Sequence, residues 1–252
     1  MKNRIIIITD AGLDDSIALQ YLFTHEKIQR FMSQPDHSID IRCVSGNVQA
    51  AQVYENVKNT LATVFDKPLP NLYITCQPAD YDADIEAWVE GYGQDGVCGL
   101  FESTDQTTYP SLEHPMEIKS ENLYILALSP FSLANELVRT YADRVRLVVS
   151  MGGHDASYSG DDMEFNQSLD PSSFDALKQI CLEREIPHSN ITYEECLNYN
   201  DLLISVPESV SDFYTRFRYY CDAYTAQMQK LDMPTTCYDL IAALKFADEL
   251  TE

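Results

Sequence analysis

Five short runs of apolar residues, rich in β-branched side chains, constrain the fold of this chain more than any other feature. They lie at residues 4–9, 40–45, 72–75, 123–128 and 145–150. Apolar residues follow one another in these runs instead of alternating with polar ones. This pattern predicts strands that are buried on both faces, as in a parallel sheet.

Segments with the composition of helices separate these runs. They lie at 14–32, 48–65, 130–142, 171–184, 207–230 and 238–250. Strand–helix alternation is typical of an open, mostly parallel, doubly wound α/β sheet flanked by helices. The stretches 77–121 and 152–170 lack both patterns, and we expect loops there. No linker or repeat divides the sequence, so we expect a single domain over residues 1–252.

The charge balance excludes some classes of partner. The chain has 17 Lys and Arg against 40 Asp and Glu, a formal net charge of −23. Binding to nucleic acid or to an anionic membrane needs a basic surface, which this composition argues against. A small-molecule ligand fits better, and the carboxylates could also attract cations.

The cysteines and the amino-terminal segment bear on location. Seven cysteines are scattered through the chain without a CxxC pair. This spacing argues against a disulfide framework and against a zinc site, and favours a reducing cytoplasm. The segment MKNRIIIITDAG does not have the pattern of a signal peptide, and no stretch approaches the ~20 apolar residues of a membrane span.

Three carboxylates follow the first apolar run: Asp10, Asp14 and Asp15, with Gly12 between them. In a doubly wound sheet, ligands bind beyond the carboxyl ends of the strands. One interpretation is structural: Asp14 caps the next helix and Asp15 lies in its first turn, where the helix dipole favours anions. The other is a cation site, for which oxygen ligands favour Ca²⁺ or Mg²⁺. The segment alone leaves both open.

The segment TDAGLDDSIAL (9–19) resembles the amino-terminal signature of the nucleoside hydrolases, the inosine–uridine-preferring N-ribohydrolase family. Six further segments resemble motifs of that family, in the family's order: VSGNV (44–48), YGQDGVCG (92–99), ALSPFSLANEL (127–137), VVSMGG (148–153), MEFNQSLDP (163–171) and CYDLIAAL (237–244). The resemblance implies a nucleoside hydrolase-like fold. It also implies metal-dependent hydrolysis of the N-glycosidic bond of ribonucleosides, giving ribose and free base, as in purine and pyrimidine salvage.

The resemblance also implies a metal site. One Ca²⁺ would be bound by the carboxylates of Asp10, Asp15 and Asp239 and by the backbone carbonyl of Leu128. Asp10 would in addition be the general base that takes a proton from the attacking water. The ion would hold the ribose diol and the water, which fixes the sugar for attack.

Further residues would bind the ribonucleoside. The resemblance implies that Asp14 and Asn47 bind the ribose hydroxyls, that Glu164 and Asn166 bind the 5′ end, and that Met151 packs beside the ring. Family members are often homo-oligomers, so a homo-oligomer is a further expectation.

Three departures from the family pattern bear on activity. Ile8 replaces the first aspartate of the signature, and Tyr92 and Tyr238 replace histidines that lie near the leaving base. A tyrosine, with an ordinary pKa of about 10, is a weak acid at neutral pH but can stack or donate a hydrogen bond. Tyr238 would take the leaving-group position and Tyr92 would contact the base. His154 follows the second glycine of VVSMGG and either lines the pocket or is an ordinary loop histidine.

These departures keep an alternative open: a nucleoside- or ribose-binding homologue that retains the metal site but has altered catalysis. A haloacid-dehalogenase-like phosphatase is disfavoured, because its nucleophilic aspartate would have to stand where Ile8 is.

Overall fold

The computed structural model describes residues 2–46, 48–65, 70–75, 97, 111–112, 118–161, 163–198, 212–232 and 234–250, without the side chains of 111–112 and 212–217. Two of the predicted substrate-binding residues, Asn47 and Tyr92, lie outside the described residues.

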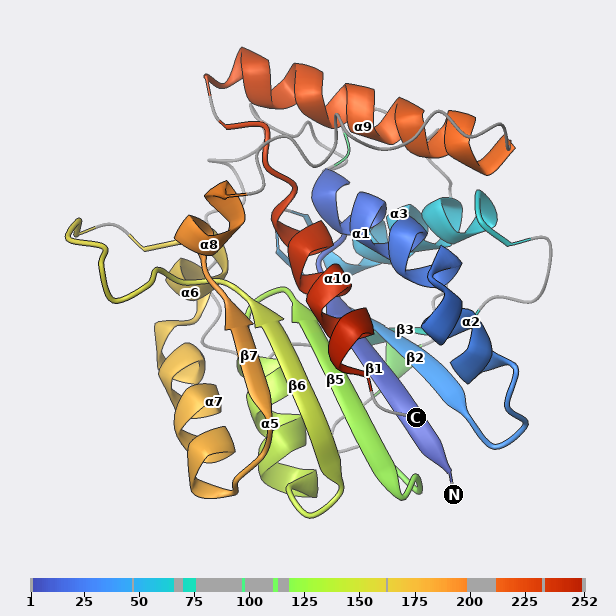
Figure 1. Ribbon diagram of the computed structural model, residues 1–252, viewed down its shortest axis with the longest axis vertical. Helices are drawn as coiled ribbons and strands as arrows, with labels where there is room; N and C mark the ends of the chain where they lie inside the picture. Colours follow the sequence, from blue (N-terminus) through green and yellow to red (C-terminus); the bar gives the residue numbers. More distant parts are fainter. Residues whose placement is uncertain are drawn as a thin grey trace.

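The described strands form one parallel sheet of seven strands in the order β4-β3-β2-β1-β5-β6-β7 (Figure 1). Their bounds are Asn3–Thr9 (β1), Ser38–Cys43 (β2), Asn71–Thr75 (β3), Ser111–Leu112 (β4), Asn122–Leu128 (β5), Val145–Met151 (β6) and His188–Ile191 (β7). The central strand β1 contains four consecutive isoleucines with no exposed surface. The predicted parallel sheet is therefore confirmed, with β1 at its centre.

Helices cover both faces of the sheet. Their bounds are Leu13–Thr24 (α1), Glu26–Met32 (α2), Ala50–Ala62 (α3), Ser132–Tyr141 (α5), Phe165–Leu169 (α6), Pro171–Glu183 (α7), Tyr193–Leu197 (α8), Asp212–Lys230 (α9) and Tyr238–Glu249 (α10). Ile5 and Ile7 belong to a hydrophobic cluster with α1, α3 and α10, whereas Ile6 and Ile8 belong to one with α5 and α7. Alternate side chains of β1 thus fill the two cores, as the period of a strand requires.

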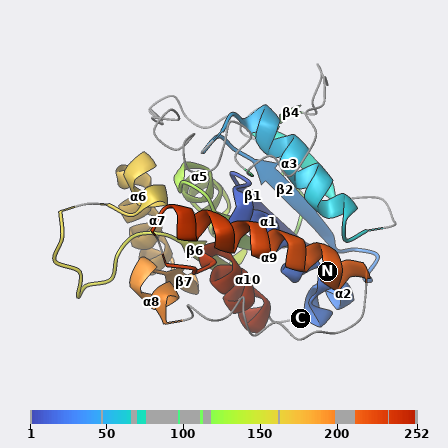
Figure 2. The same ribbon diagram turned by 90° about the horizontal axis from the view of Figure 1, so that it is seen from above.

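Helix α9 lies beyond the carboxyl ends of the strands and packs on α1 (Figures 1 and 2). Its buried residues Tyr220, Tyr224 and Met228 share a cluster with Leu13 and Leu240, the latter from α10. The helical spacing of the aromatic residues in segment 207–230 predicts that Tyr220 and Tyr224 lie in the core, and their burial confirms this. The same spacing predicts Phe213 and Phe217 in that core, but their side chains lie outside the described part.

Some element predictions need correction. Segment 14–32 is two helices, because His25 adopts extended backbone between them and its Nδ1 accepts a hydrogen bond from the Lys27 N–H at 3.3 Å. The stretch 152–170 contains the short helix α6, and 77–121 contains β4. Strand β7, with the sequence HSNI at the sheet edge, is too polar to show the buried-strand pattern. None of the described helices combines the length and the apolarity needed to cross a membrane.

Candidate active site

Three carboxylates meet at the carboxyl edge of the sheet. Asp14 and Asp15 lie in the first turn of α1, and Asp239 lies in the first turn of α10. One oxygen from each lies within 4.8 Å of the other two, a spacing that a single bound cation can bridge. The two helices pack against each other, which fixes the three side chains relative to one another. Sequence segments more than 220 residues apart (239 − 15 = 224) thus form one cluster.

Asp15 is held by two hydrogen bonds. The Thr9 hydroxyl donates to its Oδ1 at 2.5 Å, and the Gly12 N–H donates to its Oδ2 at 3.0 Å. Gly12 is the N-cap of α1, so the expectation that Asp14 caps this helix is wrong. Asp15, three residues after the cap, reaches back to the cap N–H instead, as the glutamate of a capping box does. These contacts leave Asp14 free of any capping role.

Asp10 follows β1 and lies beside the cluster, with 3% of its surface exposed. Its side chain packs directly against the backbone of Gly46, in the loop after β2. The Oδ2 atom of Asp10 and the Oδ1 atom of Asp239 are buried and have no hydrogen-bond partner within the described part of the chain. Buried carboxylate oxygens without a partner carry a large desolvation cost, which a bound cation would offset.

Burial raises the pKa values of all four carboxyls, and repulsion from neighbouring aspartates adds to this for Asp10, Asp15 and Asp239. Burial, followed by the charge of Asp14, raises the pKa of Asp10 to about 7, and burial raises that of Asp14 to about 6. The pKa values of Asp15 and Asp239 are raised well above the ordinary range, first by burial and then by the neighbouring aspartates. In the described part of the chain, no ion pair joins a lysine or arginine to these groups. The donor set and its orphaned oxygens fit a hard divalent cation.

Leu128 ends β5 at the same edge. It pairs in register with Thr9, the last residue of β1, and is 1% exposed. Its backbone carbonyl therefore belongs to the same end of the sheet as Asp10. The strand register, which the sequence does not reveal directly, places this predicted ligand at the same edge of the sheet as the carboxylates.

Glu164, Asn166 and Met151 form a second group, at the end of β6. Glu164 is the N-cap of α6, and its carboxylate accepts hydrogen bonds from three backbone N–H groups, of Gly153 at 2.8 Å, Asn166 at 3.0 Å and Gln167 at 3.0 Å. Burial raises the pKa of Glu164, and these N–H groups act in the opposite direction. The Asn166 amide donates to the Met151 carbonyl at 3.2 Å.

Glu164 thus joins the loop after β6 to α6. Its negative charge also contributes to the raised pKa of Asp10, which places it near the carboxylate cluster. The structural role in the loop is a feature that the sequence did not predict, because the hydrogen bonds run to backbone atoms.

Tyr238, the first residue of α10, is almost fully buried and stacks on Tyr193 with ring centroids 5.2 Å apart at 18°. Burial and the neighbouring Tyr193 raise the pKa of its hydroxyl. Tyr193 begins α8, which follows β7, and no motif in the sequence pointed to it. The sequence does not indicate this residue, because it follows the polar edge strand β7, which lacks the pattern of a buried strand.

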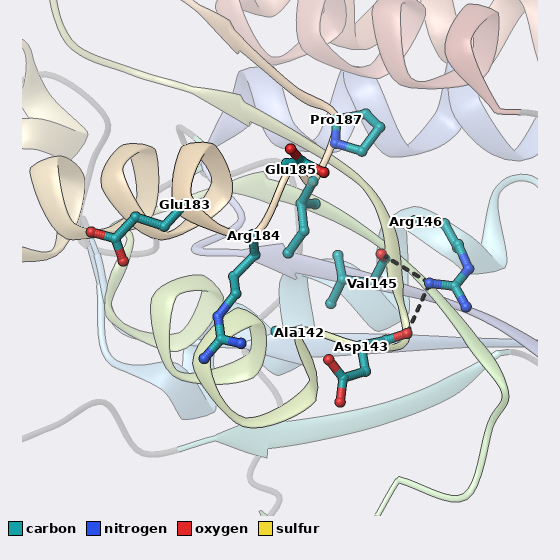
Figure 3. A pocket seen from close by; sticks show the side chains of 9 residues that line it. Ala142, Asp143, Val145, Arg146, Glu183, Arg184, Glu185 and Pro187 are labelled. Carbon is teal, nitrogen blue, oxygen red and sulfur yellow. Dashed lines mark hydrogen bonds between the residues drawn. The ribbon is translucent and has the colours of Figure 1, made fainter.

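A cavity of about 530 Å³ lies elsewhere, between the end of α5, the start of β6 and the end of α7 (Figure 3). Arg146 and Arg184 line it together with Asp143, Glu183 and Glu185. It is at the amino end of β6, whereas Met151 and the carboxylate cluster are at the carboxyl end. None of the predicted site residues lines it.

Comparison with known proteins places the chain in a family. The family model described as "Inosine-uridine preferring nucleoside hydrolase" matches residues 5–250. A search of curated proteins gave no match.

Solved structures share the fold at low sequence identity. A plant nucleoside hydrolase superposes with a TM-score of 0.71 and 16% identity, over 98% of this chain and 79% of that one. A purine-preferring ribonucleoside hydrolase from Gardnerella vaginalis superposes with a TM-score of 0.62 and 17% identity, over 97% and 80%. The type III effector protein XopQ, complexed with adenosine diphosphate ribose, gives 0.52 and 15%, over 92% and 70%. The family match extends over nearly the whole sequence, and the chain belongs to the inosine-uridine preferring nucleoside hydrolase family.

Proposed function

We propose that this chain, acting as one domain over residues 1–252, hydrolyses the N-glycosidic bond of ribonucleosides in a metal-dependent reaction. The observation that carries the proposal is the buried carboxylate cluster at the carboxyl edge of the sheet, with its orphaned oxygens, in a member of this family. The products would be ribose and a free base. A cytoplasmic location, a role in salvage and a homo-oligomeric state stay predictions.

The proposed metal ligands are Asp10, Asp15, Asp239 and the Leu128 carbonyl. Ca²⁺ is the proposed ion, because it takes several oxygen ligands, carboxylate and carbonyl alike, in flexible geometry. When bound, it would lower the pKa of a coordinated water and hold the vicinal diol. It would also lower the pKa values of the surrounding carboxyls, which burial raises in the free protein.

The residues of the chain would then act on the sugar. Cleavage of the C1′–N bond develops positive charge on the ribose ring, and the carboxylates of this edge are placed to stabilise it. Asp10 would take a proton from the attacking water. Asp14 and Asn47 would bind the ribose hydroxyls. Asn166 and Glu164 would bind the 5′ end, with Met151 beside the ring and Tyr92 against the base.

The charge of the site favours a neutral nucleoside over a nucleotide. The buried Asp10, Asp15 and Asp239 and the partly buried Asp14 gather at this edge with Glu164. No ion pair of the described residues brings a lysine or arginine to them. A phosphate group would meet like charge there, which costs binding free energy. The ligand of XopQ, adenosine diphosphate ribose, therefore serves as a comparison substrate and not as the proposed one.

A second function, ligand binding without efficient turnover, has support of its own. Ile8 is completely buried where the family signature has an aspartate, and Tyr238 takes the place of a histidine. The first change removes a carboxylate that the resemblance links to the metal, and the second puts a weaker acid beside the leaving base. A binding homologue would keep the cation and the ribose affinity.

One experiment separates the two functions. Ribose release is measured from purine and pyrimidine ribonucleosides and from adenosine diphosphate ribose, with Ca²⁺ and with a chelator. Asp143→Asn, an exposed residue at the other end of the sheet, is the control variant. Chelator-sensitive release from nucleosides supports the hydrolase. Absence of release with retained Ca²⁺ and nucleoside binding supports the binding homologue.

A further inference from the structure

His154 and Glu194 form a hydrogen-bonded pair beside the site. The distance from His154 Nδ1 to Glu194 Oε1 is 2.6 Å, and the Asp155 N–H donates to the other carboxylate oxygen at 2.9 Å. Glu194 is thereby fixed through both oxygens. Partial burial raises its pKa, but the hydrogen bonds from Asp155 and His154 outweigh this and lower it. Glu194 therefore stays ionised and favours Nδ1–H on the imidazole.

Aromatic rings hold the imidazole in place. The Tyr158 ring stacks on it at 3.7 Å and 9°, and the Tyr193 ring lies 5.6 Å away at 60°. The His154 side chain is 13% exposed. Its second nitrogen, Nε2, is buried and has no hydrogen-bond partner among the residues that the structure describes. A packed, oriented imidazole with one unsatisfied buried nitrogen is costly unless that nitrogen serves a ligand.

The pair is connected through its neighbours both to Glu164, at the proposed 5′ end of the substrate site, and to Tyr238, at the proposed leaving-group end. Gly153, the preceding residue, is bound by Glu164, whose pKa the His154 charge affects. On the other side, the Tyr193 ring is tilted against His154 and stacks on Tyr238, which takes the place of the family's leaving-group histidine. The Tyr193 N–H also donates to the Gly153 carbonyl at 3.0 Å, so α8 and the loop after β6 form one unit.

We propose that His154 protonates the leaving base and that Glu194 is its positioning residue. This inference rests on the proposed hydrolase function. The reacting form is the imidazolium, which faces Glu194, Glu164, Tyr158 and Tyr193. As the C1′–N bond breaks, its electron pair goes to the base nitrogen and the Nε2 proton of His154 transfers to the base. Water bonds to C1′ and its proton goes to Asp10, from which solvent returns a proton to His154. The sum is nucleoside plus water giving ribose plus base.

The test compares substrates that differ in their need for an acid. The bases of inosine and uridine, hypoxanthine and uracil, are poor leaving groups as anions, whereas 4-nitrophenolate leaves from 4-nitrophenyl β-D-ribofuranoside without protonation. For His154→Gln we expect kcat on inosine to fall about 10²- to 10⁴-fold, the usual contribution of a general acid. The ratio of kcat on inosine to kcat on the nitrophenyl riboside should fall at least ~30-fold. Glu194→Gln should change this ratio in the same direction by a smaller factor.

His25→Gln, a substitution at the boundary of α1 and α2, is the matched control and should leave the ratio as in the wild type. Circular dichroism and the thermal midpoint report whether each variant folds. A proportional loss on both substrates would overturn the inference and give His154 a structural role. A loss that disappears with 5′-deoxyinosine would overturn it too, since His154 would then bind the 5′-hydroxyl. No turnover of any substrate by the wild-type protein would instead overturn the proposed function itself.

Discussion

Asp10 and Gly46 are in direct contact across the ends of β1 and β2. A Cβ atom added to Gly46 would lie 1.7 Å from Asp10 Oδ2 and 2.4 Å from Asp10 Cβ. No side chain can stand at residue 46 while Asp10 keeps this position, so the glycine of VSGNV is a packing requirement of the proposed catalytic carboxylate.

Gly46→Ala should displace Asp10. Because Asp10 is a proposed Ca²⁺ ligand, we expect Ca²⁺ affinity to fall at least ~10-fold, together with a loss of thermal stability from overpacking of about 1–3 kcal/mol. Isothermal titration and thermal unfolding measure the two effects. Adding Asp10→Gly removes all three clashing atoms, Oδ2, Cγ and Cβ, so the double variant should regain stability but not Ca²⁺ affinity. A Gly46→Ala protein that binds Ca²⁺ as the wild type does would contradict this packing argument.

Removal of Ca²⁺ should destabilise the protein more at high pH than at low pH. The pKa of Asp10 is raised to about 7 and that of Asp14 to about 6 in the folded, cation-free protein, above the ordinary 3.8. A folded-state pKa above the unfolded one contributes stability that is present below pH ~4 and is lost as the pH rises through the folded pKa. The cation-free protein should therefore lose stability between pH 4 and 7.

Differential scanning fluorimetry with Ca²⁺ and with a chelator tests this at pH 5 and pH 8. At saturating Ca²⁺ we expect a rise in the thermal midpoint of about 5–10 °C at pH 8, from ~2.7 kcal/mol at a hundredfold excess over Kd. The rise at pH 5 should be clearly smaller, because protonated carboxyls bind the ion less well. An equal rise at both pH values, or none at pH 8, would argue against a metal site built from these carboxyls.

Asp10→Asn should abolish turnover and leave the fold intact. The amide keeps the shape of the side chain but cannot accept a proton, so we expect kcat on ribonucleosides to fall about 10²- to 10⁴-fold. Asp143→Asn, with a similar change of charge on an exposed surface, should retain wild-type kcat. Turnover by Asp10→Asn at the wild-type rate would remove Asp10 from the role of base.

Asp239→Ala should act on binding instead. Its carboxylate is a proposed Ca²⁺ ligand, and one of its oxygens is buried without a hydrogen-bond partner among the described residues. We expect Ca²⁺ affinity and ribose affinity to fall together, by at least ~10-fold each, because the ion is proposed to hold the ribose diol. Titration of Ca²⁺ and of ribose measures both, and unchanged Ca²⁺ affinity would refute the ligand assignment.

The sequence predicted the central part of the fold because its strands are continuous apolar runs. Ile5 to Ile8 of β1 show this pattern, and the helices that flank the sheet follow from the alternation of strand and helix. Edge strand β7 was missed because HSNI carries polar side chains, as an edge strand can. The helix break at His25 was also missed, since the residue continues an apparently helical segment and only its extended backbone ends it.

The site was predictable to the extent that motifs encode it. The structure brings Asp14, Asp15 and Asp239 together, whereas the ligand set that the resemblance implies has Asp10 in place of Asp14. Nothing in the spacing of residues 15 and 239 indicates their proximity. The backbone hydrogen bonds of Glu164, and the pair of His154 with Glu194, depend on tertiary geometry. The sequence does not decide whether His154 lines the pocket or is an ordinary loop histidine. Its partner Glu194 lies 40 residues away, on a helix that the sequence pattern does not show.

Tyr238→His tests the leaving-group position directly. Tyr238 stacks on Tyr193, and burial raises the pKa of its hydroxyl, so it is a poor proton donor at neutral pH. A histidine keeps an aromatic ring for the stack and titrates near neutral pH. We therefore expect a rise in kcat on purine ribonucleosides of about 10-fold or more, and little change on the nitrophenyl riboside. The rise should be larger in the His154→Gln background, where no other acid is proposed.

Tyr238→Phe is the matched control: it keeps the ring, cannot donate a proton and should show no rise. Equal rates for Tyr238→His and Tyr238→Phe on inosine would mean that stacking, and not proton donation, is what this position contributes.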